Sequence, residues 1–232
     1  MILPIGSEPP PFISIILPTY NRWRLVTRAI QSIQAQAFTD WELLIIDDGS
    51  RDGTYDFVTT ETDYDKRVRY HYATNRGLAM ARNIGLTIGR GKYFTFLDDD
   101  DEYLPEHLAI RVEYLRAHPE VELLHGGVEI IGSEMVADKH DPSRMIPISE
   151  CVVGGTFFIR RDLAERLQGF RPIEYGDDAD FFERAENAGA IIHKIDIPTY
   201  RYNRTEEDSL TAIAEREGIE GIKQFRKAWL KK

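Results

Sequence analysis

The 232-residue sequence contains a single cysteine, Cys151. One thiol excludes an internal disulfide and is typical of proteins from a reducing compartment. Long hydrophobic runs are also missing, because no apolar stretch approaches the roughly 18 residues that a membrane-spanning helix needs. Residues 1–12 have neither the cationic start nor the apolar core of a signal peptide. These absences lead us to expect a cytoplasmic protein.

Positive charge is scarce as well. The 39 Asp and Glu residues outnumber the 29 Lys and Arg residues, which gives a formal net charge of −10. This balance argues against nucleic acid as a partner, because a phosphate backbone needs a basic surface. A nucleotide held through a bridging metal ion is still compatible with it. No repeat, low-complexity tract or linker divides the chain, so we predict that residues 1–232 form a single domain.

The first hundred residues alternate between apolar runs and helical patterns. The alternation predicts an α/β fold with a mostly parallel central sheet and helices on both faces. Each loop after a strand carries acidic or turn residues, which places the polar groups at one edge of the sheet. The predicted strands cover residues 13–17, 43–46, 67–73 and 92–97, and the predicted helices cover 25–38, 78–88 and a segment from about 54.

The second half of the sequence is less regular. Residues 132–150 are polar and predict a long loop. The glycines at 154–155 predict the start of a strand at which another part of the protein comes very close to the backbone. The other predicted elements are helices at 105–117, 162–167 and 176–189, strands at 121–131, 154–159 and 190–195, and a helical tail at 212–232.

Four consecutive carboxylates, Asp98 to Asp101, follow the predicted strand at 92–97. Carboxylate oxygens are the ligands that Mg²⁺ and Mn²⁺ prefer, and the carboxyl ends of parallel strands are where ligands bind in such sheets. The alternative is a solvated acidic turn. The position directly after a buried strand favours the metal site.

Several sequence blocks occur in a fixed order along the chain. They are ISIILPTYNR at 13–22, WELLIIDDGSRDGT at 41–54, NRGLAMARNIGL at 75–86, GKYFTFLDDDDEYLP at 91–105, GGTFFIRRDL at 154–163 and GDDADFFERA at 176–185. Together they resemble the family 2 glycosyltransferases, which have the GT-A fold, over nearly all of residues 12–200. The resemblance implies a nucleotide-binding half at 12–104, an acceptor-binding half at 105–200 and a helical tail at 201–232.

The resemblance assigns a donor pocket to the first half. It implies that Asp48 accepts a hydrogen bond from the nucleotide base. A carboxylate that accepts from a ring N–H suits uracil or thymine, so we expect a UDP- or dTDP-linked sugar. The alternative for Asp47, Asp48 and Ser50 is that they cap the helix that starts near Thr54. The other implied donor-pocket residues are Pro18, Thr19, Tyr20, Arg22, Arg76, Arg82 and Asn83, with surface ion pairing as the alternative for the last three.

The family's Asp-x-Asp metal motif corresponds here to Asp98-Asp99-Asp100. The resemblance implies that Asp100 is the direct ligand of Mn²⁺ or Mg²⁺ and that Asp98 is the second candidate. Asp98 and Asp99 would also contact ribose or a water ligand. Because four Asp residues are adjacent, the register is open by one position, and Asp101 is an alternative ligand.

Asp177 and Asp178 stand where the family has Glu-Asp or a variant at the start of a helix. The second acid of that pair is the family's general base, which points to Asp178, while Asp177 would bind substrate. The alternative is a helix cap, because the helix dipole stabilises a carboxylate there.

The resemblance therefore implies an inverting, metal-dependent glycosyltransferase of polysaccharide biosynthesis. Its donor would be a nucleotide-diphosphate sugar, and its acceptor a hydroxyl of an unknown glycan or lipid-linked glycan. The rival hypothesis is a catalytically inactive protein of the same fold that only binds nucleotide sugars.

The tail combines a hydrophobic stripe with basic residues. One hypothesis is a basic amphipathic helix that lies on the inner face of an anionic membrane, near a lipid-linked acceptor. The alternative is that the stripe packs on the catalytic domain. The stripe consists of Ile219, Ile222, Phe225 and Trp229, and the basic residues are Lys223, Arg226, Lys227, Lys231 and Lys232.

Overall fold

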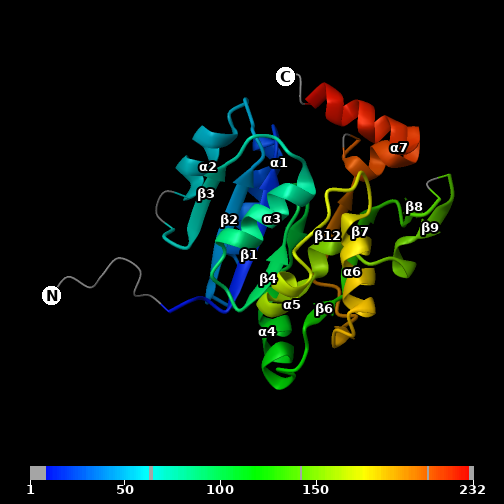
Figure 1. Cartoon of the computed structure of the whole chain (residues 1–232). Helices are drawn as coiled ribbons and strands as arrows, with labels where there is room; N and C mark the ends of the chain where they lie inside the picture. Colours follow the sequence, from blue (N-terminus) through cyan, green and yellow to red (C-terminus); the bar gives the residue numbers. More distant parts are fainter. Residues whose placement is uncertain (1–8, 63–64, 142, 208, 230–232) are drawn as a thin grey trace.

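A seven-stranded sheet forms the centre of the computed structural model (Figure 1), which describes residues 9–62, 65–141, 143–207 and 209–229. The strand order is β11-β6-β10-β4-β1-β2-β3, and every neighbouring pair is parallel except those that involve β10. The mostly parallel sheet is therefore confirmed. The strands are β1 (Ile13–Thr19), β2 (Trp41–Asp47), β3 (Val68–Tyr72), β4 (Tyr93–Phe96), β6 (Leu123–His125), β10 (Phe158–Arg160) and β11 (Ile192–Lys194).

Helices cover both faces of this sheet. Successive side chains of a strand point to opposite faces, so Ile15 packs into one hydrophobic cluster and Ile16 into another. The Ile15 cluster is covered by α1 (Trp23–Gln34), α2 (Thr54–Thr62) and α4 (His107–Ala117). The Ile16 cluster is covered by α3 (Leu78–Ile88), α5 (Arg161–Arg166) and α6 (Asp177–Asn187). The predicted arrangement of helices on both faces is confirmed.

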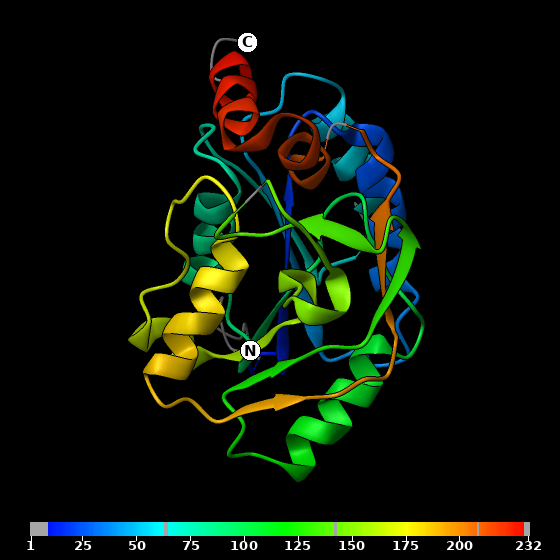
Figure 2. The ribbon, with the colours of Figure 1, turned by 90° about the vertical axis from the view of Figure 1, so that its right-hand side faces the viewer.

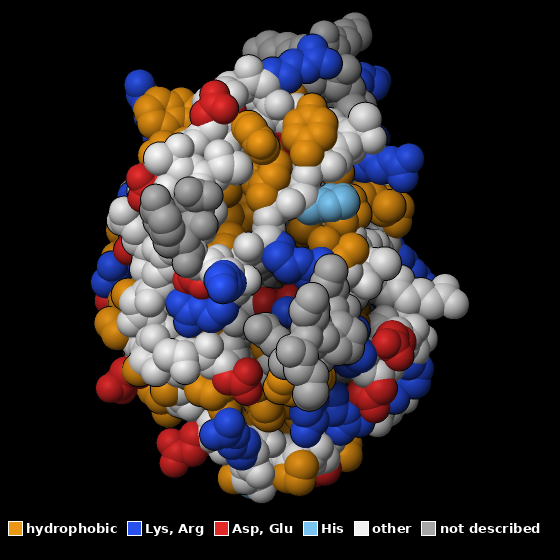
Figure 3. Space-filling view, turned by 90° about the vertical axis from the view of Figure 1, so that its left-hand side faces the viewer, with side chains coloured by type: hydrophobic (Ala, Val, Ile, Leu, Met, Phe, Trp, Pro, Cys, Tyr) orange, Lys and Arg blue, Asp and Glu red, His pale blue; other side chains and the backbone are white. Residues whose placement is uncertain are grey.

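The strand β3 lies at one edge of the sheet, on the side of the molecule that Figure 3 shows. It is five residues long and alternates Arg69 and His71 with apolar or aromatic side chains. Arg69 forms an ion pair with the buried Glu42, with 3.1 Å between Nη1 and Oε2. A short edge strand with charged side chains discourages pairing with other strands.

The prediction of a single strand over residues 121–131 is wrong. The chain leaves the large sheet after β6, turns at Gly126 and Gly127 with φ of 95° and 80°, and enters a second sheet. Only glycine adopts such angles easily, and a Cβ on Gly127 would lie 2.1 Å from the carbonyl oxygen of Ile197. The second sheet has the order β5-β12-β7, formed by β5 (Glu102–Tyr103), β12 (Tyr200–Arg204) and β7 (Val128–Gly132).

The prediction of a long loop over residues 132–150 is also wrong. This segment forms an antiparallel hairpin of β8 (Met135–Ala137) and β9 (Met145–Pro147), followed by the 3₁₀ turn η1 (Ile148–Glu150). A second 3₁₀ turn, η2 (Gly154–Thr156), replaces the start of the strand predicted at 154–159. The close approach expected at its glycines is present, because a Cβ on Gly155 would lie 2.1 Å from the hydroxyl of Tyr200.

The tail forms α7 (Leu210–Trp229), which bends at Gly218. In Figure 2 it lies at the top of the molecule, above α6 and β12. Ile222 is buried against Ala137 of β8, and Ile219 and Phe225 pack around the same cluster, as the packing hypothesis expects. The side chains of Arg226 and Trp229, and residues 231–232, lie outside the described part. Among the helices described, none has the length and hydrophobicity to cross a membrane.

Packing of α7 on the domain can be tested by truncating its buried side chain. We expect Ile222→Ala to lower the free energy of unfolding by about 2–5 kcal/mol, because it opens a cavity against β8. Lys223→Ala, at the exposed neighbour, should change it by less than about 0.5 kcal/mol. Urea denaturation of both variants measures the difference. Equal stabilities would show that the helix does not pack on the domain in solution.

Candidate active site

Two adjoining cavities open at the carboxyl ends of β1, β2 and β4. The first has a volume of about 410 Å³ and the second about 460 Å³, and both are lined by Asp98 and Tyr202. Parallel strands that end at one edge bring their following loops together. The first cavity receives nine of the predicted residues, which are Pro18, Thr19, Tyr20, Arg22, Asp48, Arg76, Asp98, Asp99 and Asp100.

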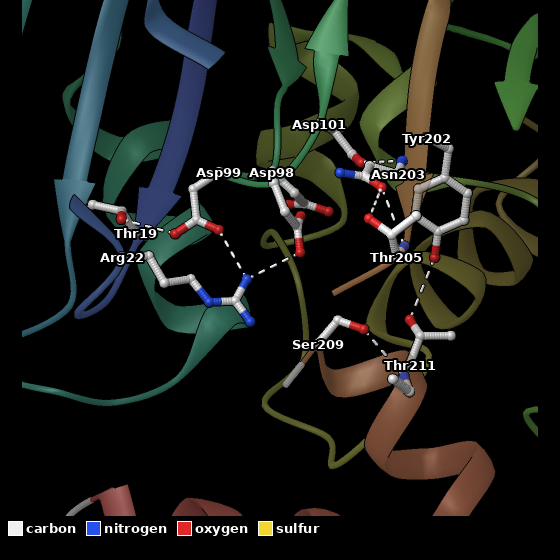
Figure 4. Close-up of polar contacts among 12 residues, drawn as sticks. Thr19, Arg22, Asp98, Asp99, Asp101, Tyr202, Asn203, Thr205, Ser209 and Thr211 are labelled. Carbon is white, nitrogen blue, oxygen red and sulfur yellow. Dashed lines mark hydrogen bonds and ion pairs between the residues drawn. The ribbon is translucent and has the colours of Figure 1, made fainter. Parts of the chain in front are cut away.

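Asp99 lies beside Arg22 at the first cavity (Figure 4), and Asp100 lines the same cavity. Asp99 accepts hydrogen bonds from Thr19 Oγ1 at 2.8 Å and from Arg22 Nη1 at 3.1 Å. The same Arg22 nitrogen lies 3.0 Å from Asp100 Oδ2. Burial, and then the charge of Asp99, raise the pKa of Asp100 to about 7. One guanidinium therefore compensates two buried carboxylates only in part, and an additional cation would be favourable here.

Asp101 points away from this cavity, toward β12 (Figure 4). It is 1% exposed. Its Oδ1 accepts from the backbone N–H of Asn203 at 2.7 Å, and its Oδ2 accepts from the hydroxyl of Tyr200 at 2.5 Å. These contacts disfavour Asp101 as a metal ligand and favour the register Asp98-Asp99-Asp100.

The chemistry of these carboxylates fits a divalent ion that also takes substrate oxygens. Such an ion needs only one or two protein carboxylates, because phosphate and water complete its coordination. Asp98 and Asp100 lie at the cavity wall and could supply them. Within the described residues, no group of three or more His, Cys, Asp or Glu side chains forms a complete protein-only site.

Asp48 organises the loop before α3. Its Oδ1 accepts from the backbone N–H of Arg76 at 2.9 Å, and its Oδ2 accepts from that of Gly77 at 2.7 Å. At the start of α2, Asp52 accepts from the Thr54 N–H at 3.0 Å. Asp48 therefore holds the loop that carries Arg76 at the cavity wall.

Arg82 lines the second cavity rather than the first. It is 3% exposed. Its Nη1 donates to Asp177 Oδ2 at 2.9 Å, and its Nη2 donates to Asp98 Oδ1 at 3.0 Å. Arg82 thus connects the acidic cluster after β4 with the acidic pair at the start of α6. Asn83 instead exchanges hydrogen bonds with the backbone of Phe170.

Asp177 and Asp178 begin α6 and line the second cavity. Asp178 Oδ1 accepts from the N–H of its neighbour Ala179 at 2.8 Å, while Oδ2 accepts from the N–H of Gly154 in η2 at 2.9 Å. The N-cap of α6 is Gly176. Burial, and then the charge of Asp177, raise the pKa of Asp178. A raised pKa makes a carboxylate a stronger base.

The far wall of the first cavity was not predicted from the sequence. It comes from β12 and the start of α7, through Tyr202, Asn203, Arg204 and residues 209–211. Tyr202 Oη lies 3.3 Å from Thr211 Oγ1, which ties the strand to the helix. A five-residue strand without an apolar run offers no signal that would place it opposite β4.

The sequence model of the family described as Glycosyl transferase family 2 matches residues 14–167. The chain belongs to this family. A Haemophilus influenzae protein named "Uncharacterized glycosyltransferase" is 35% identical over 179 residues, which cover 75% of this chain and 71% of that protein. A Rickettsia felis protein of the same name is 40% identical over 103 residues, 44% of this chain and 17% of the relative.

A Campylobacter jejuni GalNAc(5)-diNAcBac-PP-undecaprenol beta-1,3-glucosyltransferase is 43% identical over 96 residues. These residues cover 40% of this family 2 chain and 31% of the relative. The chain thus spans well under half the length of the Rickettsia and Campylobacter proteins.

Solved structures show the same GT-A fold. TarS 1-349 of S. aureus in complex with UDP-GlcNAc superposes with a TM-score of 0.69 at 20% identity, over 85% of this chain and 60% of TarS 1-349. The mannosyltransferase PcManGT of Pyrobaculum calidifontis, in complex with GDP-Man and Mn²⁺, gives 0.68 at 21% identity, over 86% of this chain and 60% of that protein. The predicted family and fold are confirmed.

Proposed function

We propose that this family 2 protein is an inverting glycosyltransferase whose donor occupies the first cavity and whose acceptor occupies the second. The observation that carries this proposal is the meeting of the two cavities at Asp98, with Asp178 on the wall of the second. A catalyst must bring an acceptor hydroxyl and a donor sugar together, and adjoining cavities provide that arrangement.

The reaction requires a base for the acceptor. Asp178 takes the hydroxyl proton while that oxygen forms a bond to the anomeric carbon. The bond from this carbon to the diphosphate breaks on the opposite face, and its electron pair leaves with the nucleoside diphosphate. The raised pKa of Asp178 supports the role, because the carboxylate holds the proton more strongly than an exposed Asp does.

The donor side is suited to a nucleoside diphosphate. Arg22, Arg76 and Arg204 line the first cavity, and guanidinium groups bind phosphate oxygens well. Asp98 and Asp100 would hold Mn²⁺ or Mg²⁺, which when bound neutralises charge on the leaving diphosphate. We propose uracil or thymine as the base, beside Asp48. The UDP-GlcNAc complex of TarS 1-349 supports a uridine donor, whereas the GDP-Man and Mn²⁺ complex of PcManGT supports the metal.

The acceptor is proposed to be a glycan hydroxyl, free or lipid-linked. The name of the Campylobacter relative describes an undecaprenol-linked acceptor, and an E. coli relative is named for colanic acid biosynthesis. Membrane contact through the hydrophobic stripe of α7 is not part of the proposal, because Ile219, Ile222 and Phe225 pack inward.

A thermal-shift panel of nucleoside diphosphates tests the donor assignment. We expect UDP or dTDP at about 100 times its Kd to add roughly 2.7 kcal/mol of stability, and only with Mn²⁺ or Mg²⁺ present. Asp100→Ala should remove the metal-dependent part. Stabilisation by GDP alone would contradict the pyrimidine assignment. Equal stabilisation in EDTA would contradict the metal.

A further inference from the structure

We infer that the sugar unit that enters the second cavity carries no negative charge. The inference rests on the proposed assignment of this cavity to the acceptor. It concerns the chemical class of the acceptor, which the family does not fix.

Carboxylates outnumber cationic side chains in the lining of the second cavity. Besides Asp177 and Asp178, the wall includes Asp138, Glu150, Glu174, Glu183 and Glu186, contributed by η1, α6 and the loops after β8 and before α6. The backbone N–H of His140 lowers the pKa of Asp138, so this side chain is charged at neutral pH. Charges of one sign around a cavity with low-dielectric walls produce a strong local potential.

The cations in the same lining are already paired with these acids. Arg82 contacts both Asp177 and Asp98. Lys139 Nζ lies 2.9 Å from Glu183 Oε2. An entering phosphate or uronate would therefore meet net negative charge and compete for cations that have partners. Such like-charge contacts are a usual source of selectivity against a ligand.

The remaining wall suits an uncharged sugar ring. Apolar and aromatic side chains face the cavity, among them Val136, Ile148, Val152, Tyr175 and Phe182. The hydroxyl of Tyr175 donates to the carbonyl oxygen of Ala137 at 3.2 Å, which fixes the ring on β8. Ionised carboxylates only accept hydrogen bonds, and sugar hydroxyls donate them. The same wall that repels an anion can therefore bind a neutral polyol.

The first cavity has a different balance of charge. Arg22, Arg76 and Arg204 line it together with Asp48, Asp98, Asp99 and Asp100, so its cations and carboxylates are nearly equal in number. In the second cavity the carboxylates far outnumber Arg82 and Lys139. An anionic ligand is therefore less favoured in the second cavity than in the first.

Cys151 provides a built-in probe of this potential. It lines the second cavity and is the only cysteine in the sequence. Burial raises the pKa of its thiol, and so do the charges of Asp178, Asp138 and Glu150. The thiolate attacks a methanethiosulfonate to form a mixed disulfide and releases methanesulfinate. Cationic and anionic versions of this reagent therefore compare the two signs of charge at one atom.

The first measurement compares the rates at which Cys151 is modified by the cationic trimethylammonioethyl methanethiosulfonate and by the anionic sulfonatoethyl methanethiosulfonate. Each rate is divided by the rate at which the same reagent modifies 2-mercaptoethanol. We expect the cationic reagent to react with Cys151 at least about tenfold faster, a difference that added NaCl should reduce. Glu150→Gln should lower the ratio. Glu113→Gln, at an exposed position on α4, is the matched control and should leave it unchanged. A normalised ratio near one would overturn the inference.

The second measurement uses methyl glycosides that differ only at C6. Methyl β-glucoside is paired with methyl β-glucuronide, and methyl β-galactoside with its uronide, at saturating UDP and Mn²⁺. Ligand-observed NMR should show the uronide binding at least about tenfold more weakly in any pair that binds. A uronide that binds as well as its neutral partner would overturn the inference. Where neither member binds, the Cys151 ratio decides. Neither failure would affect the donor thermal shift, which tests the proposed function separately.

Discussion

Replacing Asp178 with Asn is expected to lower the rate of sugar transfer by about 10²–10⁴-fold, the usual contribution of a general base. The variant keeps the side-chain volume but removes the site that accepts the proton. Both Asp178 oxygens accept backbone N–H groups, from Ala179 and Gly154. The amide nitrogen of Asn must therefore face one of these donors, so we also expect a loss of about 1–3 kcal/mol in stability.

Donor binding separates the catalytic role from a structural one. Asp178 does not line the first cavity, so the Kd for UDP with Mn²⁺ should change little in Asp178→Asn. Near wild-type turnover would falsify the assignment and make Asp177 the acid to test. Equal losses of donor binding and turnover would show that Asp178 only shapes the pocket. An inactive wild-type protein that still binds the donor would support the rival hypothesis of a nucleotide-sugar binder.

The pH dependence of the wild type provides a further check of Asp178. Its pKa is raised above the usual 3.8 by burial and by Asp177. The base is needed in its ionised form, so turnover should fall as the pH drops through the raised pKa, at a higher pH than for an exposed Asp. The fall should be absent from the residual activity of Asp178→Asn.

Asp101→Ala is expected to be the most destabilising change within the acidic cluster. It removes the acceptor of the Tyr200 hydroxyl and of the Asn203 N–H, and each buried donor left without a partner costs about 1–3 kcal/mol. Asp101→Asn should cost less, because its amide oxygen still accepts one of these bonds. Urea denaturation compares the two variants with wild type.

Asp100→Ala is the matched control for this prediction. Burial and the neighbouring Asp99 raise the pKa of Asp100 to about 7, so its charged form is unfavourable in the folded protein. Its removal should therefore cost little stability but abolish the metal-dependent effect of UDP. Asp101→Ala should retain that effect in its folded fraction. The reverse result would mean that the metal register is shifted by one and that Asp101 is the ligand.

The sequence alone determined the first half of the fold. The runs ISIIL and LLII are long enough to identify buried strands, and the helices between them have clear apolar spacing, so β1, β2 and α3 lie where predicted. The acidic residues after these strands could be placed at one sheet edge because parallel strands share their carboxyl ends. The family resemblance came from the same local blocks.

The contacts of each acid were decided by the tertiary structure. Asp98 to Asp101 are equivalent in sequence, yet Asp99 and Asp100 turn to Arg22 while Asp101 turns to Tyr200 and Asn203. Arg82 was predicted in the donor pocket but lines the second cavity, where it contacts Asp177, a partner 95 residues away in the chain. Contacts between distant segments leave no local pattern in a single sequence.

In the second half of the chain, too, the tertiary structure decided what the local sequence pattern could not. The chain leaves one strand and enters another, in a different sheet, at Gly126 and Gly127, although the sequence of residues 121–131 predicts a single strand. Hydrophobic periodicity reports which residues are buried, but not which sheet buries them. The sequence therefore determined which side chains could carry the chemistry. Only the folded chain decided which of them line the first cavity, which line the second and which connect the two.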